Sequence, residues 1–122
     1  MENTLKTHHR LLLTGAAGGL GRALRDQLKR NCEVLRLSDK ADLGAARPGE
    51  EIVMADLANA DDVDAMVAGV DAIVHMGGIS VEAPFADILQ ANIVGAVHLY
   101  EAARRHAVRR IVFASSNHVT GF

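Results

Sequence analysis

The sequence predicts an α/β protein in which a doubly wound parallel sheet carries helices on both faces. Short apolar runs that do not alternate with polar residues recur between amphipathic stretches, as expected for strands buried on both sides. A glycine-rich or polar cluster follows each run, and the carboxyl ends of parallel strands meet at one edge of a sheet. Right-handed crossovers and a reversal after the third strand predict the order 3-2-1-4-5.

Length and composition narrow the class of protein. The chain has 122 residues, one cysteine and a net charge of −2. We expect a flexible leader over residues 1–9, including His8 and His9, and one domain over residues 10–122. The charge balance argues against nucleic acid and membrane surfaces as partners, and the single Cys32 excludes an internal disulfide. Without a signal peptide, a membrane span or a recognisable metal-ligand spacing, we expect a soluble, cytoplasmic, metal-free protein.

The first strand and helix carry the clearest functional signal. Leu11–Leu13 is typical of a buried strand, and Gly15, Gly18 and Gly21 follow it at three-residue spacing. The first glycine allows a tight turn, the second lets the backbone approach a diphosphate, and the third permits close packing of the helix on the strand. The start of the helix directs N–H groups and its positive dipole end toward one place, where a phosphate fits. A glycine triplet that serves only the turn is the alternative. The predicted helix has an apolar face of Leu20, Leu24 and Leu28.

Two acidic residues follow the next two predicted strands. Asp39 ends the strand 33–38, where a carboxylate accepts hydrogen bonds from the adenosine ribose and repels the extra phosphate of NADP. The neighbouring Lys40 is a cation that could accommodate that phosphate, and a plain loop acid is the alternative for Asp39. Asp56 lies near the end of the strand 51–57, after a surface connection over residues 41–50. Its carboxylate could accept a hydrogen bond from the adenine amino group.

The middle of the chain predicts a helix, a fourth strand and a loop. Asn59 is a candidate N-cap for a helix over 60–68, with Asp61 and Asp62 in its first turn. The strand 71–78 ends in Gly77 and Gly78, which leave space for a cofactor across the strand tips. We expect His75, inside this strand, to be a packed core histidine. Ser80, in the loop 79–84, is a candidate substrate contact.

The longest helical pattern spans residues 85–106. It has an apolar stripe that we expect to face the core, and Asn92 and Gly95 interrupt it, which indicates close packing or a polar contact near the site. A fifth strand over 109–114 follows, with Ser115, Ser116, Asn117 and His118 at its tip. The stripe consists of Phe85, Leu89, Ile93, Ala96 or Val97, and Tyr100.

Several motifs together resemble the extended short-chain dehydrogenase/reductase family, also described as the NAD-dependent epimerase/dehydratase family. The resemblance covers nearly all of residues 10–122, and it implies a Rossmann-type domain that binds NAD. More narrowly, residues 77–82 and 115–118, followed by Gly121, resemble the uronate dehydrogenases of this family. This implies oxidation of glucuronate or galacturonate, small sugar acids, at the anomeric carbon to an aldarolactone. The family motifs are Thr14 to Gly21, Asp56-Leu57, His75 to Gly78, Asn92 to Gly95 with Glu101 to Ala103, and Phe113 to Ser116.

The resemblance also implies roles for individual residues. Ser116 matches the catalytic serine, whose hydroxyl bonds the oxygen being oxidised, and Ser80, Asn117 and His118 join it as substrate contacts. Asn92 matches an asparagine beside the catalytic centre, whereas His98 departs from an asparagine that is common in the wider family. The implied cofactor contacts are Gly15, Ala17, Gly18, Gly19, Leu20, Gly21, Asp39, Asp56, Leu57, Met76, Gly77, Gly78, Asn92 and Ser115.

The general base of this family has no counterpart in the sequence. That base is a tyrosine with a lysine four residues later, but Tyr100, the single tyrosine, has Arg104 at that offset and lies on the apolar stripe. We therefore expect the amino-terminal half of an enzyme, inactive alone and truncated before the later strands, with an exposed apolar edge at the fifth strand. Another sugar epimerase or dehydratase, or a non-catalytic NAD-binding module, are the alternatives. The sequence leaves homo-oligomerisation open.

Overall fold

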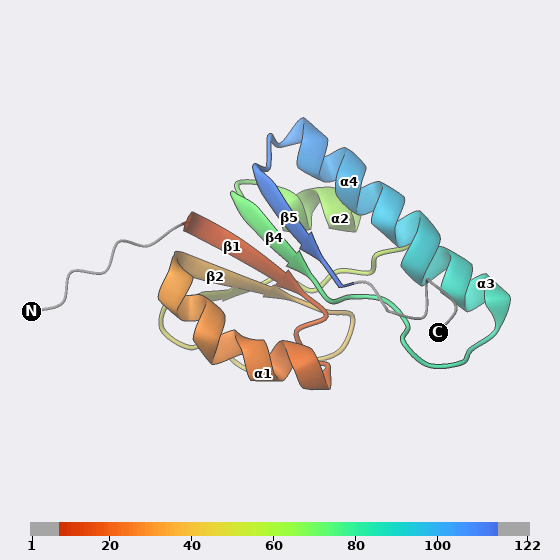
Figure 1. Cartoon of the computed structure of the whole chain (residues 1–122), viewed down its shortest axis with the longest axis horizontal. Helices are drawn as coiled ribbons and strands as arrows, with labels where there is room; N and C mark the ends of the chain where they lie inside the picture. Colours follow the sequence, from red (N-terminus) through yellow and green to blue (C-terminus); the bar gives the residue numbers. More distant parts are fainter. Residues whose placement is uncertain (1–7, 115–122) are drawn as a thin grey trace, which may run out of the picture.

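A parallel five-stranded sheet forms the centre of the molecule. The computed structural model describes residues 8–114, and its strands are ordered β3-β2-β1-β4-β5 (Figure 1), which confirms the predicted order. All four neighbouring pairs are parallel, and Thr14 is level with Ser38 on one side and His75 on the other. The strands are β1 His8–Thr14, β2 Cys32–Ser38, β3 Glu50–Ile52, β4 Ala72–His75 and β5 Arg110–Phe113.

Helices cover both faces of this sheet. Helix α1 lies on one face, and α2 and α4 lie on the other (Figure 1). Helix α4 continues from α3 through a π-helical segment, so the three form one long rod with a wider turn in its middle. The helical elements are α1 Gly19–Leu28 with the short turn η1 Lys29–Asn31, α2 Ala60–Val67, α3 Phe85–Ile88, the π-helical η2 Leu89–Val94, and α4 Gly95–Arg105.

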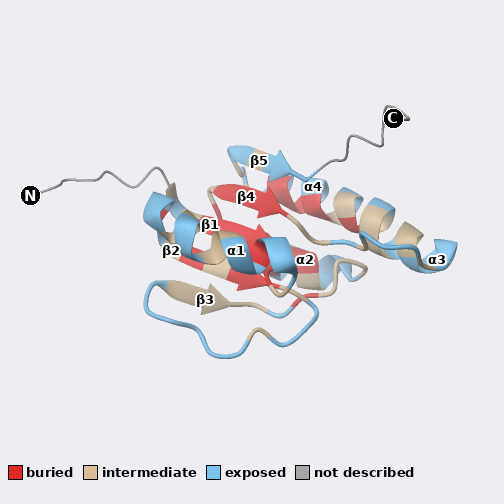
Figure 2. Ribbon diagram, turned by 60° about the horizontal axis from the view of Figure 1, so that its bottom comes forward, coloured by how far each residue is buried: buried red, intermediate tan, exposed pale blue. Residues whose placement is uncertain are grey.

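Alternate residues of the central strands build two separate hydrophobic cores. Leu12 and Ile73 point to one face, and Leu11, Leu13 and Val74 point to the other. Strands β1, β2 and β4 are accordingly the most buried parts of the chain, whereas β5 is exposed (Figure 2). The core beneath α2 and α4 adds Ala55, Val63, Met66, Val67, Val70, Leu99, Ala102 and Ala103. The core beneath α1 adds Ala16, Cys32, Leu35 and Leu37, with Leu24 and Leu28 packed on it.

The first strand begins earlier than the sequence pattern indicates. His8 pairs with Cys32 in the β1–β2 ladder, and the His9 N–H donates to the Asp71 carboxylate at 2.7 Å. Backbone pairing and this side-chain acceptor extend the strand into a polar stretch that we expected in the leader. Both histidines therefore belong to β1.

The third strand is shorter than predicted. Only Glu50–Ile52 pair fully with β2, although the N–H groups of Val53 and Ala55 still donate to the carbonyls of Leu37 and Asp39 at 3.0 and 3.2 Å. Beyond this point the Asp56 N–H turns to the Asp62 carboxylate in α2, at 3.1 Å. From Asp56 onward, the segment is thus held by a side chain of α2 rather than by backbone pairing with β2.

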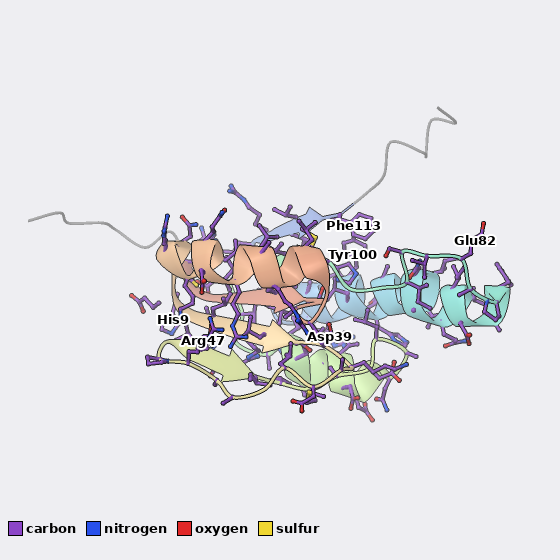
Figure 3. All side chains as sticks on the ribbon, turned by 90° about the horizontal axis from the view of Figure 1, so that it is seen from below. His9, Asp39, Arg47, Glu82, Tyr100 and Phe113 are labelled. Atoms are coloured by element: carbon purple, nitrogen blue, oxygen red, sulfur yellow. The ribbon has the colours of Figure 1, made fainter. Side chains whose placement is uncertain are left out.

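The apolar stripe predicted for the long helix faces outward, so its assignment to the core was wrong. Tyr100 is 45% exposed and lies 6.4 Å from the Phe113 ring, at the outer edge beside β5 (Figure 3). Phe85, Ile93 and Val97 are exposed as well. The buried face instead presents Gly95, Leu99, Ala102 and Ala103, whose mostly small side chains let the helix approach the sheet closely. Small residues give a weak hydrophobic pattern, which explains the error.

Candidate functional site

A cleft of about 750 Å³ runs along the carboxyl edge of the sheet. It collects residues from the segments that follow all five strands, including Ala114 directly after β5. Of the residues predicted from the sequence, twelve line it: Gly15, Gly18, Gly19, Leu20, Gly21, Asp39, Asp56, Leu57, Met76, Gly77, Gly78 and Ser80. Ala17 and Asn92 lie outside the lining, and Ser115, Ser116, Asn117 and His118 lie outside the described residues.

The glycine-rich turn requires the absence of side chains at two positions. Gly15 has φ of +66°, and a Cβ there would lie 2.6 Å from the Met76 carbonyl carbon. A Cβ on Gly21 would overlap the Gly15 carbonyl oxygen and lie 2.9 Å from the Ala16 Cα. The turn after β1 is therefore pressed between the end of β4 and the first turn of α1, as the glycine spacing predicts.

The first turn of α1 presents unpaired donors to the cleft. Within residues 8–114, the N–H groups of Gly19, Leu20 and Gly21 have no backbone acceptor, and this turn carries no acidic residue. A Cβ on Gly19 would meet nothing within 4 Å, so the approach is open. Leu20 is 61% exposed and lines the cleft instead of joining Leu24 and Leu28 in the core, because the helix has only begun there. An anion fits this turn.

Asp39 fixes the turn from the β2 side. Its Oδ2 accepts the Ala17 N–H at 3.0 Å and its Oδ1 accepts the Ala41 N–H at 3.1 Å, so both carboxylate oxygens are oriented. The Ala16 N–H donates to the Ser38 carbonyl at 3.2 Å. Figure 3 shows Asp39 at the tip of β2, near the start of α1. Each oxygen keeps a further lone pair for a ligand hydroxyl, and Lys40 lines the cleft beside it.

The segment after β3 forms the wall between α2 and β4. The Asp56 Oδ1 accepts the Ala58 N–H at 2.9 Å, and the Asn59 side chain caps α2 by accepting the Asp62 N–H at 3.1 Å, as predicted. Leu57 packs against two glycines: a Cβ on Gly77 would lie 3.0 Å from its Cδ1, and a Cβ on Gly95 would lie 2.8 Å from its Cβ. The wall is therefore tightly packed from behind.

Thr14 and His75 form a buried hub that the sequence patterns did not indicate. The Thr14 hydroxyl accepts the N–H groups of Met76 and Gly77, both at 3.0 Å, and lies 2.7 Å from the His75 Nδ1. With both lone pairs occupied, the hydroxyl donates a hydrogen bond to Nδ1, so His75 is neutral and carries its hydrogen on Nε2. Burial lowers the pKa of His75 to about 4, in agreement with this assignment. The prediction of a packed core histidine is confirmed.

Asn92 holds the loop that follows β4. Its Oδ1 accepts the Ile79 N–H at 2.7 Å and its Nδ2 donates to the Ile79 carbonyl at 2.8 Å, from within the π-helical η2. A Cβ on Gly78, whose φ is +119°, would lie 2.7 Å from the same Oδ1. This confirms the polar contact predicted for the interrupted helix. Asn92 therefore supports the loop bearing Ser80 from behind and does not line the cleft.

Asp87 and Gln90 also line the cleft, from α3 and η2, and the sequence patterns did not single them out. Both belong to a stretch whose apolar periodicity dominates the signal. Among residues 8–114, no group of three or more histidine, cysteine, aspartate and glutamate side chains is arranged to hold a metal ion. No helix in this range is long and apolar enough to cross a bilayer.

Comparisons with known proteins agree with this geometry. The family described as "NAD dependent epimerase/dehydratase family" matches residues 11–121. The uronate dehydrogenase of Pseudomonas syringae pv. tomato is 59% identical over 122 residues, which cover 99% of this chain and 44% of that protein. A crystal structure of uronate dehydrogenase from Agrobacterium tumefaciens, a variant complexed with NAD, superposes with a TM-score of 0.88 at 62% identity. The superposed part covers 90% of this chain and 42% of the A. tumefaciens chain.

A second solved structure gives the same picture. Glucuronic acid dehydrogenase from Chromohalobacter salexigens has a TM-score of 0.88 and 58% identity, over 91% of this chain and 42% of its own. The chain thus spans less than half the length of the relatives it matches.

Proposed function

Because the chain belongs to the NAD-dependent epimerase/dehydratase family, we propose that its cleft binds NAD and contributes to the oxidation of a uronic acid at the anomeric carbon. Two features of the cleft together carry the proposal. The first turn of α1 has N–H groups without a backbone acceptor, and the Asp39 carboxylate lies at the tip of β2 beside this turn. These two features match the diphosphate and the ribose of a dinucleotide, in the order in which the cleft presents them.

The rest of the cleft suits the two ends of the cofactor. The adenine would lie against Leu57, with the remaining Asp56 carboxylate oxygen available to its amino group. The nicotinamide end would lie toward Gly77, Gly78 and Ser80, where side chains are small. With Asp39 oriented by two N–H groups, a negative charge faces the ribose, which favours NAD over NADP despite Lys40.

The substrate assignment rests on the relatives. Proteins named as uronate dehydrogenases are 57% to 61% identical to this chain. Bound NAD would supply the hydride acceptor for oxidation at the anomeric carbon of the sugar acid. We propose that Ser116 hydrogen-bonds the oxygen undergoing oxidation, while Ser80, Asn117 and His118 orient the sugar.

We propose that Tyr100 is not the base that takes the proton of the anomeric hydroxyl. No tyrosine in these 122 residues has a lysine four positions later. Tyr100 lies on the outer face of α4 against Phe113, and it is absent from the cleft lining. The chain's own residues would then bind the cofactor and orient the sugar, and the inactivity of the 122-residue chain alone stays a prediction.

Two measurements test the proposal. Isothermal calorimetry of the 122-residue chain with NAD and NADP tests the cofactor site, and we expect heat from NAD with weaker or absent heat from NADP. The substrate is tested with protein expressed from the complete open reading frame, by monitoring the formation of NADH at 340 nm. Activity with glucuronate or galacturonate supports the proposal. Activity only with nucleotide sugars favours an epimerase or dehydratase, and NAD binding without turnover of any sugar favours a non-catalytic module.

A further inference from the structure

His98 connects the long helix to the wall of the cleft. Its Nδ1 lies 2.8 Å from the Leu57 carbonyl oxygen, across 41 positions of sequence. A carbonyl oxygen only accepts, so Nδ1 carries a hydrogen and donates it. The imidazole therefore acts here as a fixed N–H donor from α4 to the segment between β3 and α2.

The Leu57 peptide lies where ladder pairing has already ended. The N–H groups of Asp56 and Ala58, on either side, are bonded to the side chains of Asp62 and Asp56. Both of these bonds are local to the turn that starts α2. Among the side-chain hydrogen bonds of residues 8–114, His98 gives the one that joins residues 56–58 to α4.

The same helix also sets the position of the Leu57 side chain. Gly95 lies one turn before His98, and a Cβ there would lie 2.8 Å from the Leu57 Cβ. Leu99, the residue after His98, is fully buried in the core, as is Ala102, so α4 is anchored in the core at this point. The backbone and the side chain of Leu57 are thus both positioned from α4, while Leu57 lines the cleft on its other side.

We propose that His98 is a positioning residue, which fixes the Leu57 wall and thereby sets the affinity of the cleft for its dinucleotide. The inference rests on the proposed function, since it takes NAD as the ligand. The position requires an N–H donor to the Leu57 carbonyl, but it does not require an imidazole ring. The amide nitrogen of an asparagine occupies nearly the same place as Nδ1 relative to the backbone, so asparagine would satisfy it.

The test compares two substitutions with a matched control. His98→Leu keeps the size but removes the donor, and we expect the Kd for NAD to rise about five- to tenfold. His98→Asn keeps the donor, and we expect a Kd within about twofold of the parent protein. The control is His106→Leu, since the His106 Nε2 also ties the end of α4 toward α2, at 3.0 Å from the Asp64 Oδ1, and neither residue lines the cleft. It should leave the Kd unchanged.

Two further readouts separate positioning from general loosening. In the active protein, His98→Leu should raise KM for NAD and leave kcat at saturating NAD and KM for the sugar unchanged. Hydrogen exchange of residues 55–59, without any ligand, should be faster in His98→Leu than in His98→Asn. An unchanged exchange rate overturns the inference, and so does a Kd that rises equally in His98→Asn or His106→Leu. If the parent protein does not bind NAD, the proposed function fails, and the exchange experiment still decides whether His98 positions Leu57.

Discussion

The Arg25 guanidinium in α1 donates two hydrogen bonds to the Glu50 carboxylate in β3, at 2.8 Å from Nε to Oε2 and 2.6 Å from Nη2 to Oε1. The Glu50 side chain has no exposed surface, and its Oε1 also accepts the Arg47 N–H at 2.8 Å. The hydrogen bond from Arg25 lowers the pKa of Glu50 to about 2. This pair fastens the outer strand of the sheet to the helix of the cofactor site.

Replacing Glu50 leaves the Arg25 cation beside a neutral partner in a buried setting. We expect Glu50→Gln to lower the free energy of unfolding by about 3 kcal/mol, measured by urea denaturation. The control is Asp26→Asn, which removes an exposed pair with Arg47 at 3.3 Å and should cost at most about 1 kcal/mol. Equal effects of the two substitutions would contradict a special role for the buried pair.

His75 makes stability depend on pH in a defined range. Burial lowers its pKa from 6.5 to about 4, so the folded state resists protonation and stability is complete only above about pH 6.5. As pH falls from 6.5 toward 4, we expect a loss of at most about 3 kcal/mol. Glu50, whose pKa is lowered from 4.5, begins to lose its contribution only below about pH 4.5. Unfolding curves from pH 7 to 5 therefore isolate His75, and the slope should be smaller in His75→Asn.

A comparison of Gly15 with Gly44 separates the energetic cost of steric crowding from that of backbone strain. Both have positive φ, +66° and +75°, but a Cβ on Gly44 would meet nothing within 4 Å. We expect Gly44→Ala to cost about 1 kcal/mol from strain alone. Gly15→Ala should cost about 2 kcal/mol more, because its Cβ collides with the Met76 carbonyl. Urea unfolding of both variants checks this, and similar losses would argue against a tight contact between the β1 turn and β4.

Gly19 tests the cofactor site without disturbing the fold. A Cβ there would touch nothing within 4 Å, and the residue begins α1. We expect Gly19→Ala to leave stability unchanged or to raise it by up to about 1 kcal/mol. Calorimetry should nevertheless show weaker NAD binding, since the methyl group would occupy the approach to the first turn of α1. Unweakened binding would place the diphosphate elsewhere.

Asn92 tests the loop that bears Ser80. Asn92→Asp keeps an acceptor for the Ile79 N–H but places a second oxygen against the Ile79 carbonyl, in place of the present donor at 2.8 Å. We expect this repulsion to displace the loop and to raise KM for the sugar about tenfold or more. KM for NAD should change less, because the glycine turn and Asp39, which are proposed to hold the diphosphate and the ribose, lie on other elements. The opposite split between the two KM values would contradict the assignment.

Much of the fold was predictable because several local signals agreed with it. The buried strands, the glycine turn, the Asn59 cap and the strand order followed from apolar runs and turn residues. The outward stripe through Tyr100 was not predictable, because α4 packs on the sheet through glycine and alanine, which hydrophobicity patterns underweight. The short β3 was missed because the Asp62 side chain of α2 holds its continuation at Asp56.

The residues that line the cleft were largely predictable from the sequence, whereas the residues that hold the lining in place were not. Residues with conformational or charge signatures, such as Gly15 and Asp39, lie in the cleft as their patterns indicated. Thr14 and His98 carry no such signature, since their importance arises from partners more than 40 positions away along the chain. Asn92 was noted through its low helix propensity, but its partner Ile79 became evident only in three dimensions.

The division of the hydrophobic interior into two clusters has a mechanical consequence. The sheet separates the two clusters: α1 packs on one side, α2 and α4 pack on the other, and among residues 8–114 the two clusters share no residue. Fraying of α1 would expose the cluster on its own face of the sheet and leave the cluster beneath α2 and α4 packed. Local opening of α1 would therefore not require loss of the packing behind Leu57, and the proposed entry of a dinucleotide would not require unfolding of the whole domain.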